Sequence, residues 1–301
     1  MKNVLSKITV IAVTGALAVT AFAGCGGNSS SNSSKASGAA FDSGKTIAVV
    51  TREEGSGTRD AFTELTGVLV KDGDTKTDKT TSSAVTINST EAVITNVKDN
   101  DAAIGYISLG SLNDTVKAVK IGSVEVNAEN VKSGDYAISR PFNIAYKGEL
   151  SEVAQDFVDY ILSSDGQAVV SEEGYVSVSE SAAYSGKKPE GKISVAGSSS
   201  VAPVMEKLAE AYQKINTNAK VEIQTSDSSA GMQAAMEGTC DIGMASRELK
   251  DEEAGSLESI TIAKDGIAII VNKANNCDDL TVDQIRTIYT GETTVWSDVI
   301  K

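Results

Sequence analysis

The sequence of 301 residues contains no histidine. Without an imidazole, His-based metal sites, Ser–His triads and Cys–His dyads are excluded. Proline is also scarce, at 3 residues, whereas 41% of the residues are hydrophobic, so the bulk of the chain is globular rather than disordered. We expect no metal and no cofactor, and the polar loops of a folded protein are the candidate functional sites.

The sequence also contains few cysteines and fewer positively than negatively charged residues. Of the 3 cysteines, only Cys240 and Cys277 lie beyond the N-terminal segment, and two cysteines do not make a disulfide scaffold, so we expect free thiols. Lys and Arg number 27 against 41 Asp and Glu, which gives a formal net charge of −14. This balance argues against nucleic acid as a partner. A bound anion would have to be held by local donors against an unfavourable overall field.

The N-terminus has the pattern of an export signal. Lys2 and Lys7 precede an apolar stretch, residues 8–23, which ends in Phe-Ala-Gly before Cys25. The stretch is short for a transmembrane anchor and no positive flank follows it. The ending resembles a lipoprotein signal, in which the cysteine becomes the lipidated first residue of the mature chain.

This pattern predicts the organisation of the first 45 residues. We expect residues 1–24 to be a signal peptide, Cys25 to carry the lipid, and residues 25–45, rich in Gly, Ser, Asn and Ala, to be a flexible tether. The mature protein is then extracytoplasmic and attached to the outer face of the cell membrane.

The segment TREEGSGTRD, residues 51–60, combines a strand end with a helix start. A β-branched apolar block, TIAVV, precedes it, and Ser56 or Thr58 is a natural N-cap for the helix that follows. The first amides of a helix are unpaired and carry the positive end of the macrodipole, so this loop is a seat for an oxyanion. Arg52 adds a two-pronged cation, which Glu54 is placed to hold.

Two further loops repeat this arrangement. GSSS, residues 197–200, follows the strand KISVA and precedes a helix with Pro203 in its first turn. SDSSAG, residues 226–231, follows the strand VEIQT and precedes another helical pattern. Three hydroxyl-rich loops thus each precede a helix N-terminus. Such a set of loops suits the binding of a small tetrahedral oxyanion by many neutral hydrogen-bond donors and one arginine.

These loops lie within longer segments, namely VAGSSSVAP, DSSAGM, DIGMASREL, LTVDQIRTIYTGETTVWSDV, TREEGSGTRDAF and AIGYISLG. Together, from about Thr46 to Lys301, they resemble the phosphate-binding component of the bacterial ABC phosphate importer, the PstS family. The usual member begins with the GSSS-type segment and reaches the GSGT segment in mid-chain. Here the order is reversed and each motif occurs once, so the chain reads as a circular permutation of the family pattern.

The resemblance implies an α/β, two-lobed, periplasmic-binding-protein-like fold of type II, with a ligand cleft between the lobes and two crossing hinge strands. Mapped onto this order, lobe one holds residues 46–137 plus 266–301, and lobe two holds residues 138–265. The crossings should fall near residues 139–145 and 263–269. Both ends of the permuted chain would then lie in lobe one.

The resemblance also implies a function. The protein would be a monomeric receptor, and not an enzyme, that captures inorganic phosphate and delivers it to the permease subunits of an ABC importer. The phosphate-binding residues carried over are Arg52, Ser56, Gly57, Thr58, Ser199, Ser200 and Ser228. Arg247 stands where a branch of the family has an acidic acceptor, and it either adds a second cation or faces a carboxylate.

Two other classes of function stay open. A receptor for another tetrahedral oxyanion, such as sulfate or molybdate, would use the same helix ends. A surface enzyme acting on phosphorylated substrates would need a metal cluster or a general-base histidine, and the sequence supplies neither.

Overall fold

A computed structural model describes residues 41–73 and 75–300. The expected signal peptide, the lipidation site Cys25 and most of the expected tether therefore lie outside the described residues. Within the described ranges, no helix combines the length and the apolar character that a membrane crossing requires.

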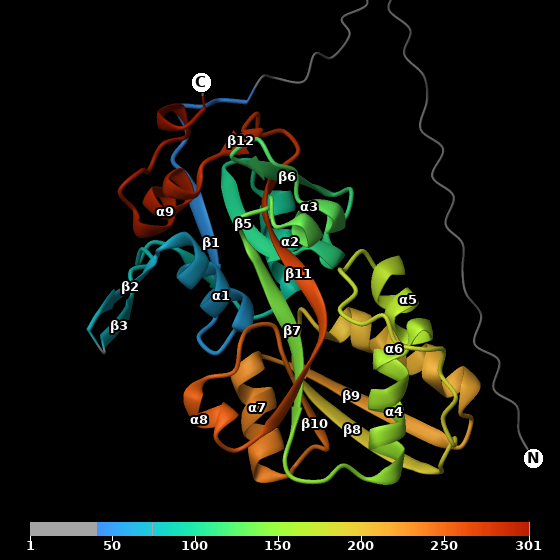
Figure 1. The fold of residues 1–301 in the computed structure, drawn as a ribbon. Helices are drawn as coiled ribbons and strands as arrows, with labels where there is room; N and C mark the ends of the chain where they lie inside the picture. The colour runs from blue at the N-terminus through green and yellow to red at the C-terminus, as the bar shows by residue number, and fades with distance from the viewer. Residues whose placement is uncertain (1–40, 74, 301) are drawn as a thin grey trace, which may run out of the picture. The chain divides into compact units, whose positions relative to one another are not determined.

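A mixed sheet of 10 strands runs through the body formed by these residues, with the path β4-β1-β5-β11-β7-β10-β8-β9 (Figure 1). β6 branches from β11, and β12 pairs with β6. The strands are β1 (Ala48–Arg52), β4 (Val85–Ile87), β5 (Ala103–Ser108), β6 (Val116–Ile121), β7 (Ser139–Tyr146), β8 (Gly191–Ser198), β9 (Ala219–Ser226), β10 (Ile242–Ala245), β11 (Glu258–Asn272) and β12 (Asp279–Leu280). A separate hairpin is formed by β2 (Leu69–Asp72) and β3 (Thr75–Asp78).

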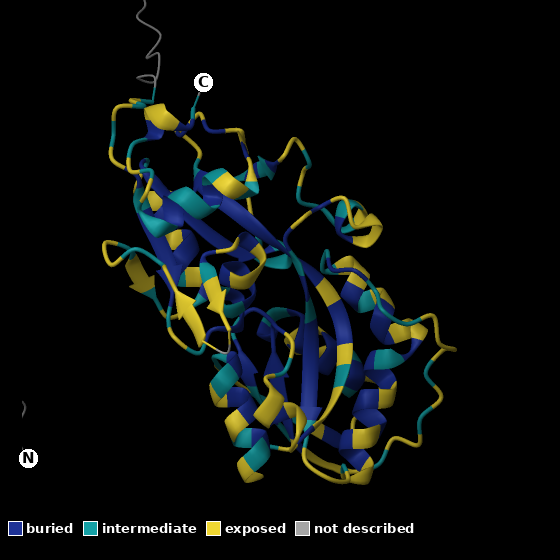
Figure 2. Cartoon of the chain, turned by 60° about the vertical axis from the view of Figure 1, so that its left-hand side comes forward, coloured by how far each residue is buried: buried dark blue, intermediate teal, exposed yellow. Residues whose placement is uncertain are grey.

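Helices cover both faces of this sheet. They are α1 (Gly57–Thr66), α2 (Thr90–Asp99), α3 (Ala128–Ser133), α4 (Glu152–Leu162), α5 (Ser164–Glu172), α6 (Ala202–Ile215), α7 (Ser228–Glu237), α8 (Asp251–Ala254) and α9 (Val282–Thr290), with the 3₁₀ turns η1 (Leu109–Ser111) and η2 (Trp296–Asp298). Figure 2 shows the central strands as a buried layer with exposed residues on the outer sides of the helices.

Two long strands, β7 and β11, join the two lobes. The C-terminal half of β11 pairs with β5 and β6 in lobe one, whereas its N-terminal half pairs with β7. β7 in turn pairs with β10 of lobe two. The chain thus passes between the lobes twice, and the segments predicted as crossings, residues 139–145 and 263–269, fall within these two strands.

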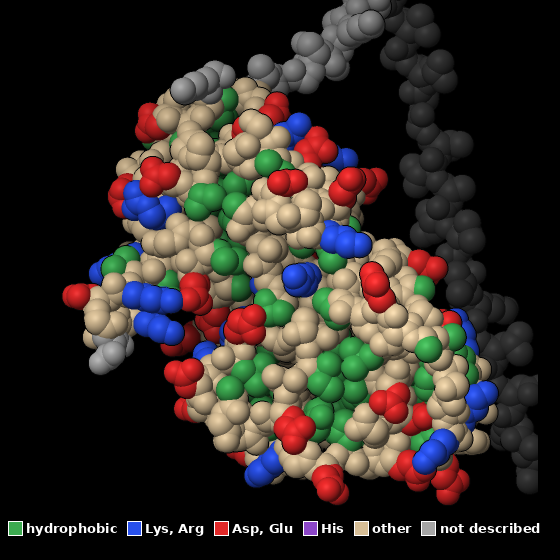
Figure 3. Space-filling view, in the orientation of Figure 1, with side chains coloured by type: hydrophobic (Ala, Val, Ile, Leu, Met, Phe, Trp, Pro, Cys, Tyr) green, Lys and Arg blue, Asp and Glu red, His purple; other side chains and the backbone are tan. Residues whose placement is uncertain are grey.

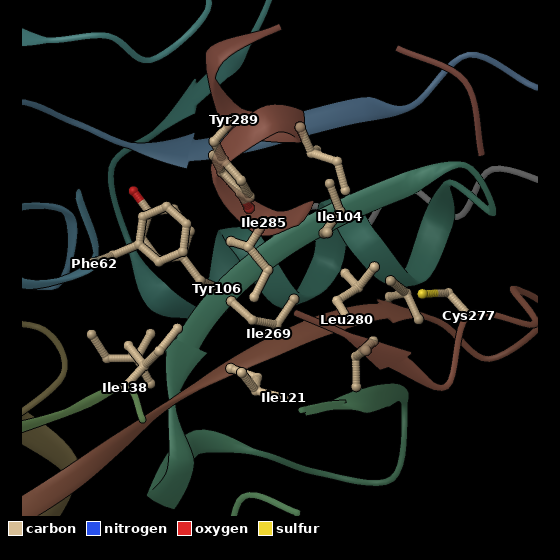
Figure 4. Packing of buried hydrophobic residues seen from close by; sticks show 14 of the residues in the cluster. Phe62, Ile104, Tyr106, Ile121, Ile138, Ile269, Cys277, Leu280, Ile285 and Tyr289 are labelled. Atoms are coloured by element: carbon tan, nitrogen blue, oxygen red, sulfur yellow. The ribbon is translucent and has the colours of Figure 1, made fainter. Parts of the chain in front are cut away.

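Each lobe has its own hydrophobic core. In lobe one, Phe62 of α1 stacks on Tyr106 of β5 with ring centroids 4.0 Å apart, and Tyr289 of α9 packs edge-on against Phe62 (Figure 4). In lobe two, α4, α5 and α6 pack on one face of the sheet around Phe157 and Tyr212. The exact lobe boundaries at residues 137–138 and 265–266 stay a prediction.

Both ends of the described chain lie in lobe one. Thr46 forms an antiparallel bridge with Val295, and the backbone N–H of Ser297 donates to the carbonyl of Ser43 at 2.7 Å. β1 shares one sheet with β11 through β5. This arrangement is the one expected if the chain is a permutation of a two-lobed fold.

Hydroxyl side chains cap several helices, and the cap at Ser56 is one of the two that the sequence predicts for α1. Ser56 caps α1, Ser151 caps α4, and Thr281 with Gln284 forms a capping box on α9. The apolar spacing after Ser151 predicts one helix that ends near Gly166, and this predicted end is wrong. Ser163 ends α4 and at once caps α5, because its hydroxyl donates to the Tyr160 carbonyl and accepts from the Gly166 N–H.

Candidate functional site

The first turn of α1 lies at the boundary between the two lobes. The hydroxyl of Ser56 accepts a hydrogen bond from the backbone N–H of Arg59 at 3.4 Å. The next residue, Gly57, faces lobe two so closely that an added Cβ atom would lie 2.3 Å from Ser228 Oγ and 2.9 Å from Ser246 Oγ. A residue without a side chain is therefore required where this helix start meets the opposite lobe.

Hydroxyl groups from the two lobes meet beside this turn. Thr58 of α1 and Ser200, in the loop before α6, are joined by a hydrogen bond of 2.8 Å between their Oγ atoms. Thr90 Oγ1, in the first turn of α2, lies 3.4 Å from Ser200 Oγ and 3.5 Å from Ser199 Oγ. Thr58, Thr90 and Ser200 are buried, so each hydroxyl is shielded from bulk water.

Arg52 ends β1 and directs its guanidinium at the same boundary. Its Nε and one terminal nitrogen each donate to the Glu53 carboxylate at 2.7 Å. That terminal nitrogen also donates to Ser199 Oγ of lobe two at 3.1 Å. The two-pronged pair with Glu53 fixes the plane of the guanidinium, which is 3% exposed.

The expectation that Glu54 holds this guanidinium is wrong. Glu53 makes the contact, and Glu54 is exposed. The reason lies in the backbone, because the chain leaves the sheet after Arg52 and turns at Gly55, whose φ is +90°. Glu53 is still beside the strand end, whereas Glu54 lies on the outside of the turn.

Lobe two contributes a second set of hydroxyls. Ser228 begins α7, and its Oγ accepts a hydrogen bond from the backbone N–H of Ser246 at 3.1 Å. Ser246 follows β10, and its Oγ accepts from Ser198 Oγ at 2.9 Å. All three serines are buried. One backbone bond also crosses here, from the Ser229 N–H to the Gly55 carbonyl at 3.2 Å.

Arg247 faces carboxylates, which decides between the two alternatives left open for it. Its terminal nitrogens pair with Glu253 at 2.7 and 2.8 Å, and its Nε lies 3.0 Å from Asp60 Oδ2 on α1 of lobe one. Burial lowers the pKa of Arg247, but Glu253 and Asp60 more than offset this and raise it above its usual value. The guanidinium is thus an ion-pair link between the lobes.

The structure therefore brings most of the predicted residues together at the lobe boundary. Arg52, Ser56, Gly57, Thr58, Ser199, Ser200 and Ser228 all lie there. Arg247 belongs to the edge of this region, Glu54 lies outside it, and Cys25 is not among the described residues.

Three further hydroxyls were not predicted, those of Thr90, Ser198 and Ser246. A signal for Thr90 was present in the sequence, because Ser89 precedes it and caps α2 by accepting from the Ala92 N–H at 3.2 Å. Ser246 directly follows the segment DIGMA. Its position beside α7 depends on the pairing of β10 with β7 and β8, which no local sequence pattern shows.

The chemistry available at this boundary is that of many neutral donors and one fixed arginine. In the part of the chain that the structure describes, no group of His, Cys, Asp and Glu could hold a metal ion. Cys240 and Cys277 are both free thiols. Acidic and basic side chains are interspersed over the face shown in Figure 3 and form no continuous basic surface there.

Comparison with known proteins places the chain in a family. The model of the PBP superfamily domain matches residues 21–165 and 182–301. "Phosphate-binding protein PstS 2" of Streptococcus agalactiae serotype V is 49% identical, with 98% of each chain covered. The PstS 2 protein of Streptococcus pneumoniae serotype 4 is 45% identical, with 91% of this chain and 92% of that one covered.

A solved structure agrees with these matches. A crystal structure of a phosphate-binding protein of a phosphate ABC transporter from Streptococcus pneumoniae TIGR4 is 46% identical, has a TM-score of 0.69, and matches over 85% of this chain and 100% of that one. The Streptococcus agalactiae relative matches from end to end, so it shares the order of motifs found here. The chain belongs to the PBP superfamily and, within it, to the PstS family.

Proposed function

We propose that this protein is an extracytoplasmic receptor that captures inorganic phosphate and delivers it to the permease of an ABC importer. The observation that carries the proposal is the meeting of Arg52 with buried hydroxyls from both lobes at the N-terminus of α1. A phosphate at this point would receive charge-assisted hydrogen bonds from the guanidinium and neutral ones from the hydroxyls and helix amides. The names of the full-length relatives support the same ligand.

Closure of the lobes is the step that would make binding tight. The donors are divided between the lobes, with Arg52, Ser56, Gly57 and Thr58 on one side and Ser199, Ser200 and Ser228 on the other. An anion between them therefore favours the closed arrangement over the open one. Closure also removes water, which strengthens every hydrogen bond to the charge.

The choice of phosphate over sulfate needs an acceptor for the phosphate proton, and Arg247 cannot supply one. Hydroxyl oxygens accept as well as donate. Thr58, Thr90 and Ser200 already exchange hydrogen bonds with one another. We propose that such hydroxyls accept the phosphate proton, in place of the carboxylate that a branch of the family uses.

Calorimetry on the purified protein, stripped of bound ligand, tests the assignment. Phosphate is expected to bind at micromolar or tighter, which corresponds to roughly 8 kcal/mol. Sulfate and molybdate at the same concentrations are the matched controls and are expected to bind far more weakly. Heat with sulfate and none with phosphate would show that the receptor takes a different oxyanion.

We further propose that Cys25 carries a lipid that holds the receptor on the outer face of the membrane. Metabolic labelling with palmitate is expected to label the unsubstituted protein. The Cys25→Ala variant is expected to lose the label and to appear in the medium. The control variant, Cys240→Ala, is expected to keep the label and to stay on the membrane. Palmitate on Cys25→Ala would contradict the anchor.

A further inference from the structure

We propose that the buried ion pair of Arg140 and Asp265, at the crossing of the two hinge strands, is a positioning device that fixes Ser246 in the anion site. Arg140 lies on β7 and Asp265 on β11, directly opposite each other in the strand register. Neither residue is among those that line the proposed phosphate site. The inference rests on the proposed function in one respect: the affinity for phosphate is used to report the position of Ser246.

Asp265 is held from both sides of the hinge. Its Oδ2 accepts from Nε and one terminal nitrogen of Arg140 at 3.1 and 3.0 Å. Its Oδ1 accepts from Ser108 Oγ at 2.9 Å and from the backbone N–H of Leu109 at 3.1 Å, at the end of β5 in lobe one. The carboxylate thus ties the end of a lobe-one strand to the hinge.

Arg140 carries this link into lobe two. Its remaining terminal nitrogen donates to the backbone carbonyl of Ser246 at 3.0 Å. The guanidinium therefore uses one edge for Asp265 and another for Ser246, a division that its planar fork permits and a lysine ammonium does not. Because the pair fixes the plane of the guanidinium, it also holds the carbonyl of Ser246 and with it the backbone that leaves this residue.

Ser246 is linked in turn to the groups proposed to bind phosphate. Its N–H donates to Ser228 Oγ, and its Oγ lies 2.9 Å from where a Cβ atom would stand on Gly57. A small displacement of the Ser246 backbone as a whole would therefore move its N–H and its side chain, and would alter the contact with the Ser228 hydroxyl and the space beside the first turn of α1. The hinge and the site are connected through three successive polar contacts.

The Arg140–Asp265 pair is almost completely removed from water. The side chains of Arg140 and Asp265 are 1% and 0% exposed. Removing two charges from water carries a large cost in free energy, so such a pair is weak evidence for stability and is often replaced by apolar groups without loss. Burial raises the pKa of Asp265 to about 6, whereas Arg140 and Ser108 act to lower it.

The test separates positioning from stability by neutralising the whole pair. Arg140→Met alone leaves Asp265 as an unpaired buried charge and is expected to lower the urea midpoint strongly. The double variant Arg140→Met/Asp265→Asn removes both charges and is expected to recover most of that midpoint. The control, Lys192→Met/Glu222→Gln, removes an exposed pair from the sheet of lobe two.

Two readouts are taken on the double variant. Amide hydrogen exchange without ligand is expected to speed up at least tenfold at Ser246, while exchange at Ile242 in β10, which pairs with β8, stays as in the parent. The dissociation constant for phosphate is expected to rise about tenfold or more. The control pair is expected to change neither quantity.

Each outcome bears on the proposal. If amide exchange accelerates equally at Ser246 and Ile242, the double substitution loosens lobe two in general, and the proposal is overturned. Exchange as slow as in the unsubstituted protein at both residues would also overturn the proposal. Unchanged phosphate affinity together with faster exchange at Ser246 would also reject the positioning role in binding. If the parent protein binds no phosphate, the proposed function fails, and the ratio of the two exchange rates still decides whether the pair fixes Ser246.

Discussion

Replacing Arg52 with lysine is expected to weaken phosphate binding roughly 10- to 150-fold. The substitution keeps the positive charge but loses the planar fork that pairs with Glu53 and reaches Ser199. A hydrogen bond to a charged group contributes about 1.5–3 kcal/mol, which sets the size of the effect. Calorimetric titration with phosphate, beside a thermal unfolding curve for each protein, is the measurement.

Arg286→Lys is the matched control for this substitution. Arg286 is on α9 of the same lobe and pairs with Asp283 and Glu292 at the surface. Its replacement is expected to leave the dissociation constant unchanged. A parent-like dissociation constant for Arg52→Lys would remove Arg52 from the site, and the guanidinium would then be only a partner of Glu53.

Replacing Gly57 with alanine is expected to weaken phosphate binding by two orders of magnitude or more, while lobe one stays folded. Alanine is a better helix former than glycine, so α1 itself gains stability. The new methyl group, however, would lie 2.3 Å from Ser228 Oγ and 3.0 Å from Ser228 Cβ. Either the lobes stay apart or the hydroxyls of Ser228 and Ser246 leave their places, and both responses remove donors from the anion.

Scattering profiles with and without phosphate distinguish these two responses, because only the first leaves the variant extended. Gly255→Ala serves as the control, since Gly255 is exposed and the nearest atom to an added Cβ lies 3.3 Å away. That change is expected to leave phosphate binding intact. Tight phosphate binding by Gly57→Ala would mean that the lobes do not close over the anion in the way proposed here.

Much of the local structure can be predicted from the sequence because it depends on near neighbours. The cap at Ser56 and the capping box of Thr281 with Gln284 need only residues within one helical turn. The strands AIGYIS and IGMA are buried in the sheet and read as apolar runs. For the same reason the helix starts that present donors to an anion are visible before any fold is known.

The remainder depends on contacts between distant segments. Arg247 finds Asp60 across the lobe boundary, 187 positions away, and no local pattern marks that partner. The difference between Glu53 and Glu54 depends on where the strand ends and on the left-handed turn at Gly55. Arg140 reads from sequence as an ordinary strand residue, and its partner Asp265 emerges only from the register of β7 with β11.

The placement of both chain ends in lobe one separates the order of synthesis from the order of assembly. Tyr289 donates to the carbonyl of Val50, and the Trp296 indole donates to the carbonyl of Ala102, so the core of lobe one is incomplete until the last residues have been made. The core of lobe two draws on one continuous stretch between Phe142 and Ala263, and it is complete earlier. Arg52 is thus among the first residues of the folded body to be synthesised, yet the core of its lobe can be completed only after the last ones.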